Sequence, residues 1–338
     1  MLPHTPWLVA IAFGLSLLGV QCWRVIALKL HIVALPNERT LHVGAIPRGG
    51  GIVFALVWLA FLAWLFVDQH IGRGDFLALF GGGACLAVLG IVDDAIDMKT
   101  LPKFLAQIVV VAWGLYWVGG VPDIVVGSVH VDLGWSGLLS GGLALLWGIS
   151  LYNFMDGIDG MAGSGAVFIS VTMGTILYMH GTPPFALLCF LLAAACAGFL
   201  WFNWPPAKLF MGDAGSGFLG YIFGVLIVAT VRDDPSLLWV WLITMGYFLT
   251  DTTTTLLLRM RYVRPFYGTH RFHAYQSLAR RTGNHLAVTG GVLLVEIFWL
   301  LPLAVVADRF PYLGPWLFLI AIAPLAVFSA VQGTLHEL

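Results

Sequence analysis

Long apolar segments alternate with short polar connectors along the whole chain. The apolar segments are about 17 to 25 residues long, which is the length that an α-helix needs to cross about 30 Å of hydrocarbon. The strands of a membrane barrel would instead alternate apolar and polar residues over about 10 residues, and that alternation occurs once, between Ile124 and Leu133. The pattern predicts an all-α polytopic membrane protein with about eleven transmembrane helices, ten being the alternative. The expected helices are 7–30, 49–67, 76–92, 103–118, 136–153, 163–180, 184–203, 216–231, 236–258, 286–305 and 312–331.

Composition supports a membrane protein and excludes nucleic-acid binding. Of 338 residues, 60% are hydrophobic and 10% are charged, whereas soluble domains carry about 25% charged residues. The net charge of −1 is unlike the basic surface that binds nucleic acid. No basic region precedes the first apolar run, so Trp7–Leu30 is expected to be a span and not a cleaved signal peptide. We expect one membrane domain over residues 1–338. The cysteines lie within apolar runs and form no CxxC pair, so they are expected to be small apolar packing residues. They are Cys22, Cys85, Cys189 and Cys196.

The basic residues set the expected orientation, because Lys and Arg collect in cytoplasmic connectors. One set of connectors holds only Arg73, Arg232 and Arg309. With the other set inside, the N-terminus is predicted to lie outside and the C-terminus in the cytoplasm, and Pro122–Gly134 becomes a short external β-hairpin. The other set holds Lys29, Arg39, Arg48, Lys99, Lys103, Lys208, Arg259, Arg261, Arg264, Arg271, Arg280 and Arg281.

The unusual polar motifs all fall on the predicted cytoplasmic side. Solvated loops do not need acids at the membrane edge, so their gathering on one face indicates a site. The motifs are Pro36–Gly50, Val92–Lys99, Asn153–Gly160, Phe210–Gly217 and Thr269–Gln276.

Asp93 and Asp94 are adjacent acids at the C-terminal end of the third predicted helix. The helix dipole disfavours acids there by about 0.3 to 1 kcal/mol each, and two neighbouring like charges add to that cost. A divalent metal ion, Lys99 or Lys103 would compensate them, and a raised pKa on one acid would make it a usable general base. The alternative is a simple solvated helix end.

Asp156 and Asp159 are each followed by glycine, with Asn153 before them. The alternating oxygen ligands of a calcium loop are absent. Glycine after each acid favours a turn whose backbone comes close to a ligand, and a turn with two solvated acids is the alternative.

Asp213 lies just before the eighth predicted helix. Free amides at a helix N-terminus bind phosphate oxygens, and a neighbouring carboxylate can hold Mg²⁺ against the same phosphates. An N-cap without ligand is the alternative, but the acids of the other connectors favour the metal.

A basic loop from Arg259 to Arg281 contains His270 and His273. Arginine forks suit diphosphate oxygens and histidine relays protons, although anchoring to anionic lipid explains the arginines equally well. Acids and cations on one face, without zinc spacing, indicate phosphate chemistry with Mg²⁺, and the membrane rim implies a lipid substrate.

Together these motifs resemble those of the polyprenyl-phosphate N-acetylhexosamine-1-phosphate transferases, glycosyltransferase family 4, over about residues 36–285. The resemblance implies that a polyprenyl phosphate, such as undecaprenyl phosphate, attacks the β-phosphate of a UDP-amino sugar and releases UMP. This is the first membrane step of a cell-surface glycan, in the bacterial inner membrane with the active site on the cytoplasmic face.

The resemblance also implies residue roles. Asp93 and Asp94 match paired aspartates that activate the lipid phosphate and support the metal site, and Asp213 matches the direct ligand of Mg²⁺, with Mn²⁺ as the alternative ion. His270 and His273 match catalytic histidines on the diphosphate side. The expected substrate-binding residues, with Phe210 against the uracil, are Arg48, Asn153, Asp156, Asp159, Phe210 and Arg271.

The last motif departs from the common His-x-His-His pattern, since Arg271 and Phe272 separate its two histidines. This variant resembles the branch that starts O-antigen synthesis for lipopolysaccharide, and it counts against the peptidoglycan branch and against UDP-GlcNAc as the assumed donor. A transporter or channel is the alternative from another class, but only Asp251 and Glu296 lie clearly within predicted spans. Membrane lipids are expected partners, and the sequence leaves the oligomeric state open, with a homodimer among the alternatives.

Overall fold

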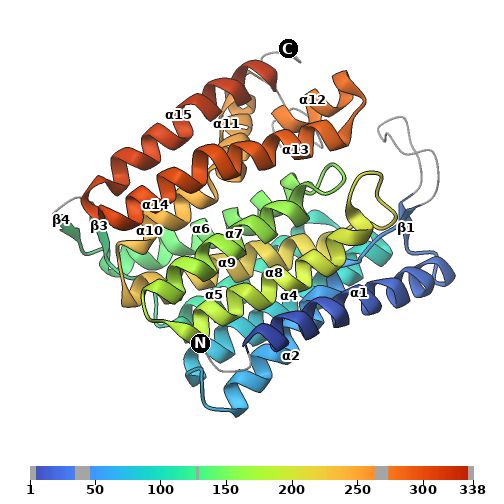
Figure 1. Ribbon diagram of the computed structural model, residues 1–338, viewed down its shortest axis with the longest axis horizontal. Coiled ribbons are helices and arrows are strands. Elements are labelled where there is room, and N and C mark those ends of the chain that lie inside the picture. Colours follow the sequence, from blue (N-terminus) through green and yellow to red (C-terminus); the bar gives the residue numbers. More distant parts are fainter. Residues whose placement is uncertain (1–4, 35–45, 127–128, 263–272, 334–338) are drawn as a thin grey trace.

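The protein is a bundle of helices, described by a computed structural model over residues 5–34, 46–126, 129–262 and 273–333 (Figure 1). Two short antiparallel ribbons accompany them, β1 Val33–Ala34 with β2 Ile46–Pro47 and β3 Ile124–Val126 with β4 Val129–Val131. The first helices are α1 Thr5–Lys29, α2 Gly51–Val67, α3 Arg73–Phe76, the π-helix η1 Leu77–Gly81, α4 Gly82–Ile96, α5 Thr100–Val118, α6 Gly134–Met155, α7 Met161–Met179 and α8 Pro183–Asn203. The remaining ones are α9 Asp213–Asp233, α10 Leu237–Thr244, α11 Gly246–Tyr262, α12 Ala274–Thr282, α13 His285–Val295, the π-helix η2 Glu296–Leu300, α14 Leu301–Arg309, the 3₁₀-helix η3 Pro311–Leu313 and α15 Gly314–Gln332.

Nine helical segments within the described residues are long and apolar enough to cross a membrane. The helices α3, η1 and α4 join into one such segment, and so do α13, η2 and α14. The expectation of a multi-pass all-α membrane protein is confirmed. The count differs from eleven at two places: α2, with 17 residues, is at the lower limit of length for a spanning helix, and the expected helix 236–258 is divided in two.

The division of the expected helix 236–258 falls at Met245, which separates α10 from α11. Gly246 follows the break, and glycine has little preference for a helix interior. The first half of α11 then carries a run of threonines around Asp251, so a single uniformly apolar span does not extend through this region. Hydropathy averaged over the whole segment concealed this change.

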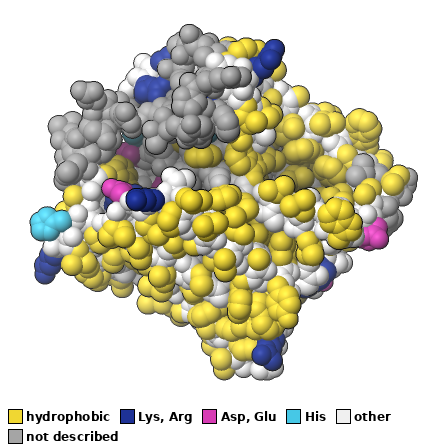
Figure 2. All heavy atoms as spheres, turned by 180° about the vertical axis from the view of Figure 1, so that it is seen from behind, with side chains coloured by type: hydrophobic (Ala, Val, Ile, Leu, Met, Phe, Trp, Pro, Cys, Tyr) yellow, Lys and Arg dark blue, Asp and Glu magenta, His cyan; other side chains and the backbone are white. Residues whose placement is uncertain are grey.

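The helices α7, α8 and α9 form the centre of the bundle, with α1 and α2 on one side and α11 to α15 on the other (Figure 1). Of the apolar window in α9, 89% is buried, compared with 17% in α1. Cross-helix hydrogen bonds fix the packing, since Trp58 Nε1 donates to Leu188 O at 2.9 Å and Ser16 Oγ donates to Ala195 O at 2.6 Å. The outer helices expose hydrophobic side chains over most of the face in Figure 2, as lipid contact requires.

The central helix α9 defines two rims of the bundle. Its 21 residues span about 30 Å at 1.5 Å per residue, which matches the hydrocarbon thickness. We call the end at Asp213 the site rim and the end at Asp233 the far rim. At the far rim Arg232 binds Asp75 through two hydrogen bonds of 3.0 and 3.1 Å, and Trp239 Nε1 donates to Val125 O of the β3–β4 hairpin at 2.8 Å.

At the far rim a histidine after α7 joins the segment after α9 to the end of α14. His180 Nδ1 lies 3.0 Å from Asp234 Oδ2, and its Nε2 lies 2.6 Å from Asp308 Oδ1. Burial alone would raise the pKa of Asp234, but hydrogen bonds from Ser236 and His180 outweigh it, so the pKa of Asp234 is lowered from the ordinary value of 3.8. The interactions of this carboxylate therefore stabilise the fold only in its ionised form.

We expect Asp234→Asn to lower the thermal unfolding midpoint near neutral pH and to have little effect in strong acid. The pKa of Asp234 is lower in the folded state than in the unfolded state. Its contribution to the free energy of unfolding is therefore fully present above pH 3.8 and is lost as the pH falls through the lower folded pKa. Unfolding midpoints of both proteins in detergent, measured from pH 6 down to pH 3, should converge. A difference that stays constant with pH would contradict this role.

Candidate active site

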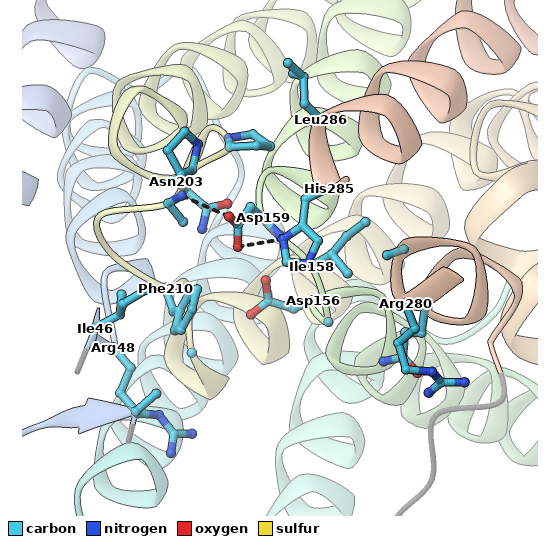
Figure 3. A pocket seen from close by; sticks show the side chains of 18 of the residues that line it. Ile46, Arg48, Asp156, Ile158, Asp159, Asn203, Phe210, Arg280, His285 and Leu286 are labelled. Carbon is cyan, nitrogen blue, oxygen red and sulfur yellow. Dashed lines mark hydrogen bonds and ion pairs between the residues drawn. The ribbon is translucent and has the colours of Figure 1, made fainter. Parts of the chain in front are cut away.

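A cavity of about 670 Å³ opens at the site rim (Figure 3). It lies where α6 and α8 end and where α9 and α13 begin. Many of the residues singled out from the sequence line it, so the structure brings together connectors that are far apart in the chain. They are Arg48, Asn153, Asp156, Asp159, Phe210 and Asp213.

Asp94 joins the start of α2 to the start of α9. Arg48 Nη2 lies 2.8 Å from Asp94 Oδ1, and the Asp94 side chain is fully buried. The backbone amides of Asp213 and Ala214 also donate to this carboxylate, at 3.1 and 3.4 Å. A carboxylate at a helix N-terminus is favoured by the dipole, so Asp94 fixes the position of Asp213.

Small residues allow α4 to approach this helix start. A Cβ on Gly90 would overlap the backbone of Ala214, and Gly212, which precedes α9, has a φ of 73° and lies against the Asp94 carboxylate. Only glycine adopts such a φ at little cost. The alternative of Asp213 as an N-cap without ligand does not apply, because Gly212 is the N-cap and Asp213 is the first residue of α9.

Lys103 holds two of the acids together. Its Nζ lies 2.8 Å from Asp93 Oδ2 and also contacts Asp213 Oδ2, while the amide of Met98 donates to Asp93 Oδ1 at 2.8 Å. The sequence required a cation beside the paired aspartates and offered Lys99 or Lys103 for that purpose. The structure selects Lys103, which was not among the expected site residues.

Backbone hydrogen bonds connect the segment before α2 to the segment before α9. The amide of Phe210 donates to Pro47 O at 2.8 Å, and the amides of Gly50 and Gly51 donate to Phe210 O and Met211 O at 3.0 and 2.9 Å. These bonds place Arg48 and Phe210 on neighbouring parts of the cavity wall (Figure 3).

Asn153 and Asp156 lie at the end of α6. Asn153 Nδ2 donates to Ser216 Oγ at 3.3 Å, which joins α6 to α9. Burial raises the pKa of Asp156 well above its ordinary value, and the negative charges of Asp213 and Asp94 raise it further. The Asp156 carboxyl is therefore within electrostatic range of both acids.

Asp159 is held by three contacts from two neighbouring segments, the one after α8 and the start of α13. Its Oδ2 accepts from the amide of Ala207 at 2.9 Å, its Oδ1 lies 3.2 Å from His285 Nδ1, and its carbonyl accepts from Thr289 Oγ1 at 2.8 Å. Asn203 adds to this by accepting from the amide of Gly160 at 3.0 Å and donating to Leu209 O at 2.9 Å.

One wall of the cavity escaped the sequence reasoning. It is formed by the end of α8 and by α12 and α13, whose residues, apart from Gln276 at the end of the last motif and Arg280 in the basic loop, belong to no recognised motif. A buried asparagine at a helix end and a histidine directly after a helix N-cap were the signals in the sequence. The missed lining residues with polar side chains are Asn203, Gln276, Arg280, Asn284 and His285.

The last motif lies only partly within the described residues. His270 and Arg271 lie outside them, while His273 is the buried residue before α12, with its ring 5.7 Å from that of Phe154 and 5.9 Å from that of Tyr275. His273 is not among the described residues that line the large cavity, and its place beside a diphosphate stays a prediction.

Two acids within the bundle are also located. Asp251 is fully buried and accepts from the amides of Ala274 and Tyr275 at 3.0 and 3.4 Å. Asp251 therefore stabilises the first turn of α12, which directly follows His273 of the last motif. Glu296 is buried at the start of the π-helix η2.

A second cavity, of about 240 Å³, adjoins the first. Its walls come from α4, α5, α6 and α9 and include the apolar side chains of Leu86, Phe104 and Ile149. Asn153 and Asp213 line both cavities, and Lys103 lines the smaller one. The two cavities thus share a wall formed by Asn153 and Asp213, and Lys103 contacts Asp213 from the smaller cavity.

The donor atoms at this wall suit Mg²⁺. Within the described residues, no group of three or more His, Cys, Asp and Glu side chains is arranged to hold a metal ion. Mg²⁺ does not need one, because one or two carboxylates together with substrate phosphates usually hold it. The Asp213 carboxylate meets that requirement, and Asp156 lies near it.

The fold and the cavity therefore define a multi-pass membrane protein with an acidic and basic site at one rim. The chain matches the family described as Glycosyl transferase family 4 over residues 76–231. It is 26% identical to a probable undecaprenyl-phosphate N-acetylglucosaminyl 1-phosphate transferase of Bacillus subtilis (strain 168), over 97% of this chain and 93% of that protein.

The matches to two further relatives extend over most of the length of those proteins. A decaprenyl-phosphate N-acetylglucosaminephosphotransferase of Mycobacterium tuberculosis (strain CDC 1551 / Oshkosh) is 30% identical over 82% of this chain and 75% of that protein. A phospho-N-acetylmuramoyl-pentapeptide-transferase of Listeria monocytogenes serotype 4b (strain CLIP80459) is 26% identical over 73% of this chain and 80% of that protein. The chain therefore belongs to glycosyl transferase family 4, the polyprenyl-phosphate N-acetylhexosamine-1-phosphate transferases, as its motifs indicated. None of these three names refers to O-antigen, and that assignment stays a prediction.

Proposed function

We propose that the protein transfers an N-acetylhexosamine 1-phosphate from a UDP-sugar to undecaprenyl phosphate or another polyprenyl phosphate and releases UMP. The observation that best supports the proposal is that the large cavity, which is lined by acidic and basic side chains, and the smaller cavity meet at Asp213 and Asn153. A reaction between a water-soluble nucleotide and a membrane lipid needs two such chambers with one shared wall. The cytoplasmic face of the bacterial inner membrane supplies both substrates, in agreement with the basic connectors of the site rim.

The large cavity suits the sugar nucleotide. Phe210 provides an aromatic ring and Asp159 a hydrogen-bond acceptor for the base, while Arg48 and Arg280 provide guanidinium groups for phosphate oxygens. Its volume of about 670 Å³ lies within the range of about 300 to 1,000 Å³ that is usual for small-molecule sites.

The smaller cavity suits the lipid phosphate. Its apolar walls offer a path for the first isoprene units, and Lys103 stands at its polar end. The Lys103 ammonium group attracts the phosphate head and keeps Asp93 close to it. We assign Asp93 to proton acceptance from the lipid phosphate, and Asp94 to holding Asp213 in place, since Arg48 and the α9 amides occupy its oxygens.

In the proposed reaction an oxygen of the lipid phosphate forms a bond to the β-phosphorus of the donor. The bond between that phosphorus and the oxygen bridging to the α-phosphate breaks, and UMP leaves with both electrons of the broken bond. Mg²⁺, or Mn²⁺ as the alternative, would neutralise charge on the diphosphate and on the leaving UMP. Asp213 would hold the ion and Asp156 would support it, while Arg48 binds Asp94 and Lys103 contacts Asp213.

The donor is proposed to be N-acetylated, in keeping with the names of the relatives. We expect the purified protein with undecaprenyl phosphate and Mg²⁺ to release UMP from at least one of UDP-GlcNAc, UDP-GalNAc and UDP-linked N-acetylated 6-deoxy sugars. Release should require the lipid phosphate and should stop when a chelator removes the divalent ion. A folded preparation that releases no UMP from any of these donors would refute the proposal.

A further inference from the structure

The first turn of α13 closes over the Asp159 turn in the wall of the large cavity (Figure 3). Asn284 caps this helix by accepting from the amide of Ala287 at 3.0 Å. His285 is the first helical residue, and its ring points toward Asp159, as the dashed line in Figure 3 marks. Neither the sequence motifs nor the proposed reaction assigns a role to His285.

His285 and Asp159 form a partly buried pair. Nδ1 of His285 lies 3.2 Å from Asp159 Oδ1 and 3.4 Å from the Asp159 backbone nitrogen, and the side chains are only 19% and 15% exposed. An ionised carboxylate can only accept, so Nδ1 must carry the hydrogen in order to bind it. A nitrogen that donates cannot also accept from the amide, and the contact with the charged oxygen is the shorter and stronger one.

Thr289 makes a second contact from the same face of α13, four residues after His285. It is fully buried, and its Oγ1 donates to Asp159 O at 2.8 Å. The two side chains thus hold the carboxylate and the carbonyl of one residue. We call His285 and Thr289 the α13 clamp.

The Asp159 turn needs such a restraint, because glycines lie on both sides of it. Gly157 precedes it, and Gly160, with a φ of 76°, follows it directly. Glycine leaves a turn with many accessible conformations. Ala207 and Asn203 hold one carboxylate oxygen and the next amide, so the clamp is what directs the remaining oxygen, Oδ1.

We propose that the α13 clamp presets Asp159 for the nucleotide, with His285 as a positioning residue that determines affinity for the sugar-nucleotide donor. The inference rests on the proposed function and extends it to a helix outside the recognised motifs. A preset group lowers the ordering cost of binding. The clamp acts on binding of the donor and does not touch the oxygens that exchange at the β-phosphorus, so its loss raises KM and leaves kcat nearly unchanged.

We expect His285→Leu to raise the KM for the UDP-sugar and the Kd for UDP about 10- to 100-fold, since it removes a hydrogen bond to a charged group. The kcat and the KM for the lipid phosphate should change by less than about threefold. Thr289→Val, which removes only the hydroxyl group, should raise the same KM less. His285→Gln keeps a donor and should restore part of the affinity.

His180→Leu is the matched control, because His180 also pairs with carboxylates but lies at the far rim. It should leave the KM for the donor and the Kd for UDP unchanged. In an Asp159→Asn background, His285→Leu should cause little further rise in the KM for the donor or in the Kd for UDP, because the charged partner is already absent.

Calorimetric titration with UDP, without lipid, separates the two proposals. A wild-type protein that binds UDP but shows no turnover refutes the proposed function and leaves the clamp to be judged by Kd. A wild-type protein that does not bind UDP refutes both. Two results would refute the proposed role of the α13 clamp. One is a UDP affinity that is unchanged in His285→Leu and in His285→Gln, and the other is additive effects of His285 and Asp159 substitutions on the Kd for UDP.

Discussion

Asp213→Asn is expected to lower kcat/KM by about a thousandfold or more while the protein remains folded. Among the described residues, Asp213 is the one carboxylate in the wall of both cavities, and it interacts with Lys103. Asparagine keeps the shape of the side chain but loses the charge that a divalent ion requires. Removing one preorganised electrostatic group from an active site typically costs about 10²- to 10³-fold, and loss of the ion adds to that.

Asp233→Asn provides the control for this variant. Asp233 is the last residue of the same helix, and its half-exposed side chain lies 3.3 Å from Arg232 at the far rim. We expect its turnover within about twofold of the wild type, because surface substitutions away from a site change little. Release of UMP by Asp213→Asn at the wild-type rate would exclude Asp213 as an essential ligand.

Lys103→Met is expected to lower kcat/KM about 10²- to 10³-fold and to reduce thermal stability in the absence of substrates. Methionine keeps the apolar stem of the side chain but removes the ammonium group that holds Asp93 and Asp213. Without it, like charges face each other at the end of α4 and the start of α9. The same ammonium group attracts the lipid phosphate in the proposed reaction, so the KM for undecaprenyl phosphate should rise as well.

Lys99→Met tests whether another basic residue near this connector contributes to activity and stability as Lys103 is expected to do. Lys99 is exposed and precedes α5, only four residues before Lys103. Its replacement should leave the turnover, the KM for the lipid and the unfolding midpoint close to those of the wild type. Equal losses in both variants would mean that general positive charge at the membrane surface, and not the contact with two acids, explains Lys103.

The sequence predicted the fold class because the length of an apolar segment is a local property. Most expected helices agree with the observed ones to within a few residues, as for α7 and α8. The break at Met245 was missed, since averaging hydropathy over a window hides a single-residue break before a glycine. The short ribbon of β1 and β2 was also missed, because two strands of two residues leave no periodic pattern.

The sequence predicted that the acids lie on one side of the membrane, because their motifs fall in connectors of the same side. It did not predict which side chains bind them. Two adjacent aspartates at a helix end require a cation, and the choice of Lys103 depends on how α5 packs beside α9. Asp94 was expected near the metal, and the structure shows it held by Arg48 and by backbone amides. His285 carried no motif at all, because its importance arises only where α13 meets the Asp159 turn.

The most direct measurement of where the chemistry takes place is anomalous scattering from Mn²⁺ in crystals grown with UDP. We predict a manganese peak bound to the Asp213 carboxylate, with the uridine in the cavity between Phe210 and Asp159. Lys103 and Arg48 should remain beside the acids. A nucleotide and ion bound at the far rim, near Asp75 or Asp234, or an ion that leaves Asp213 without contact, would contradict the proposed site.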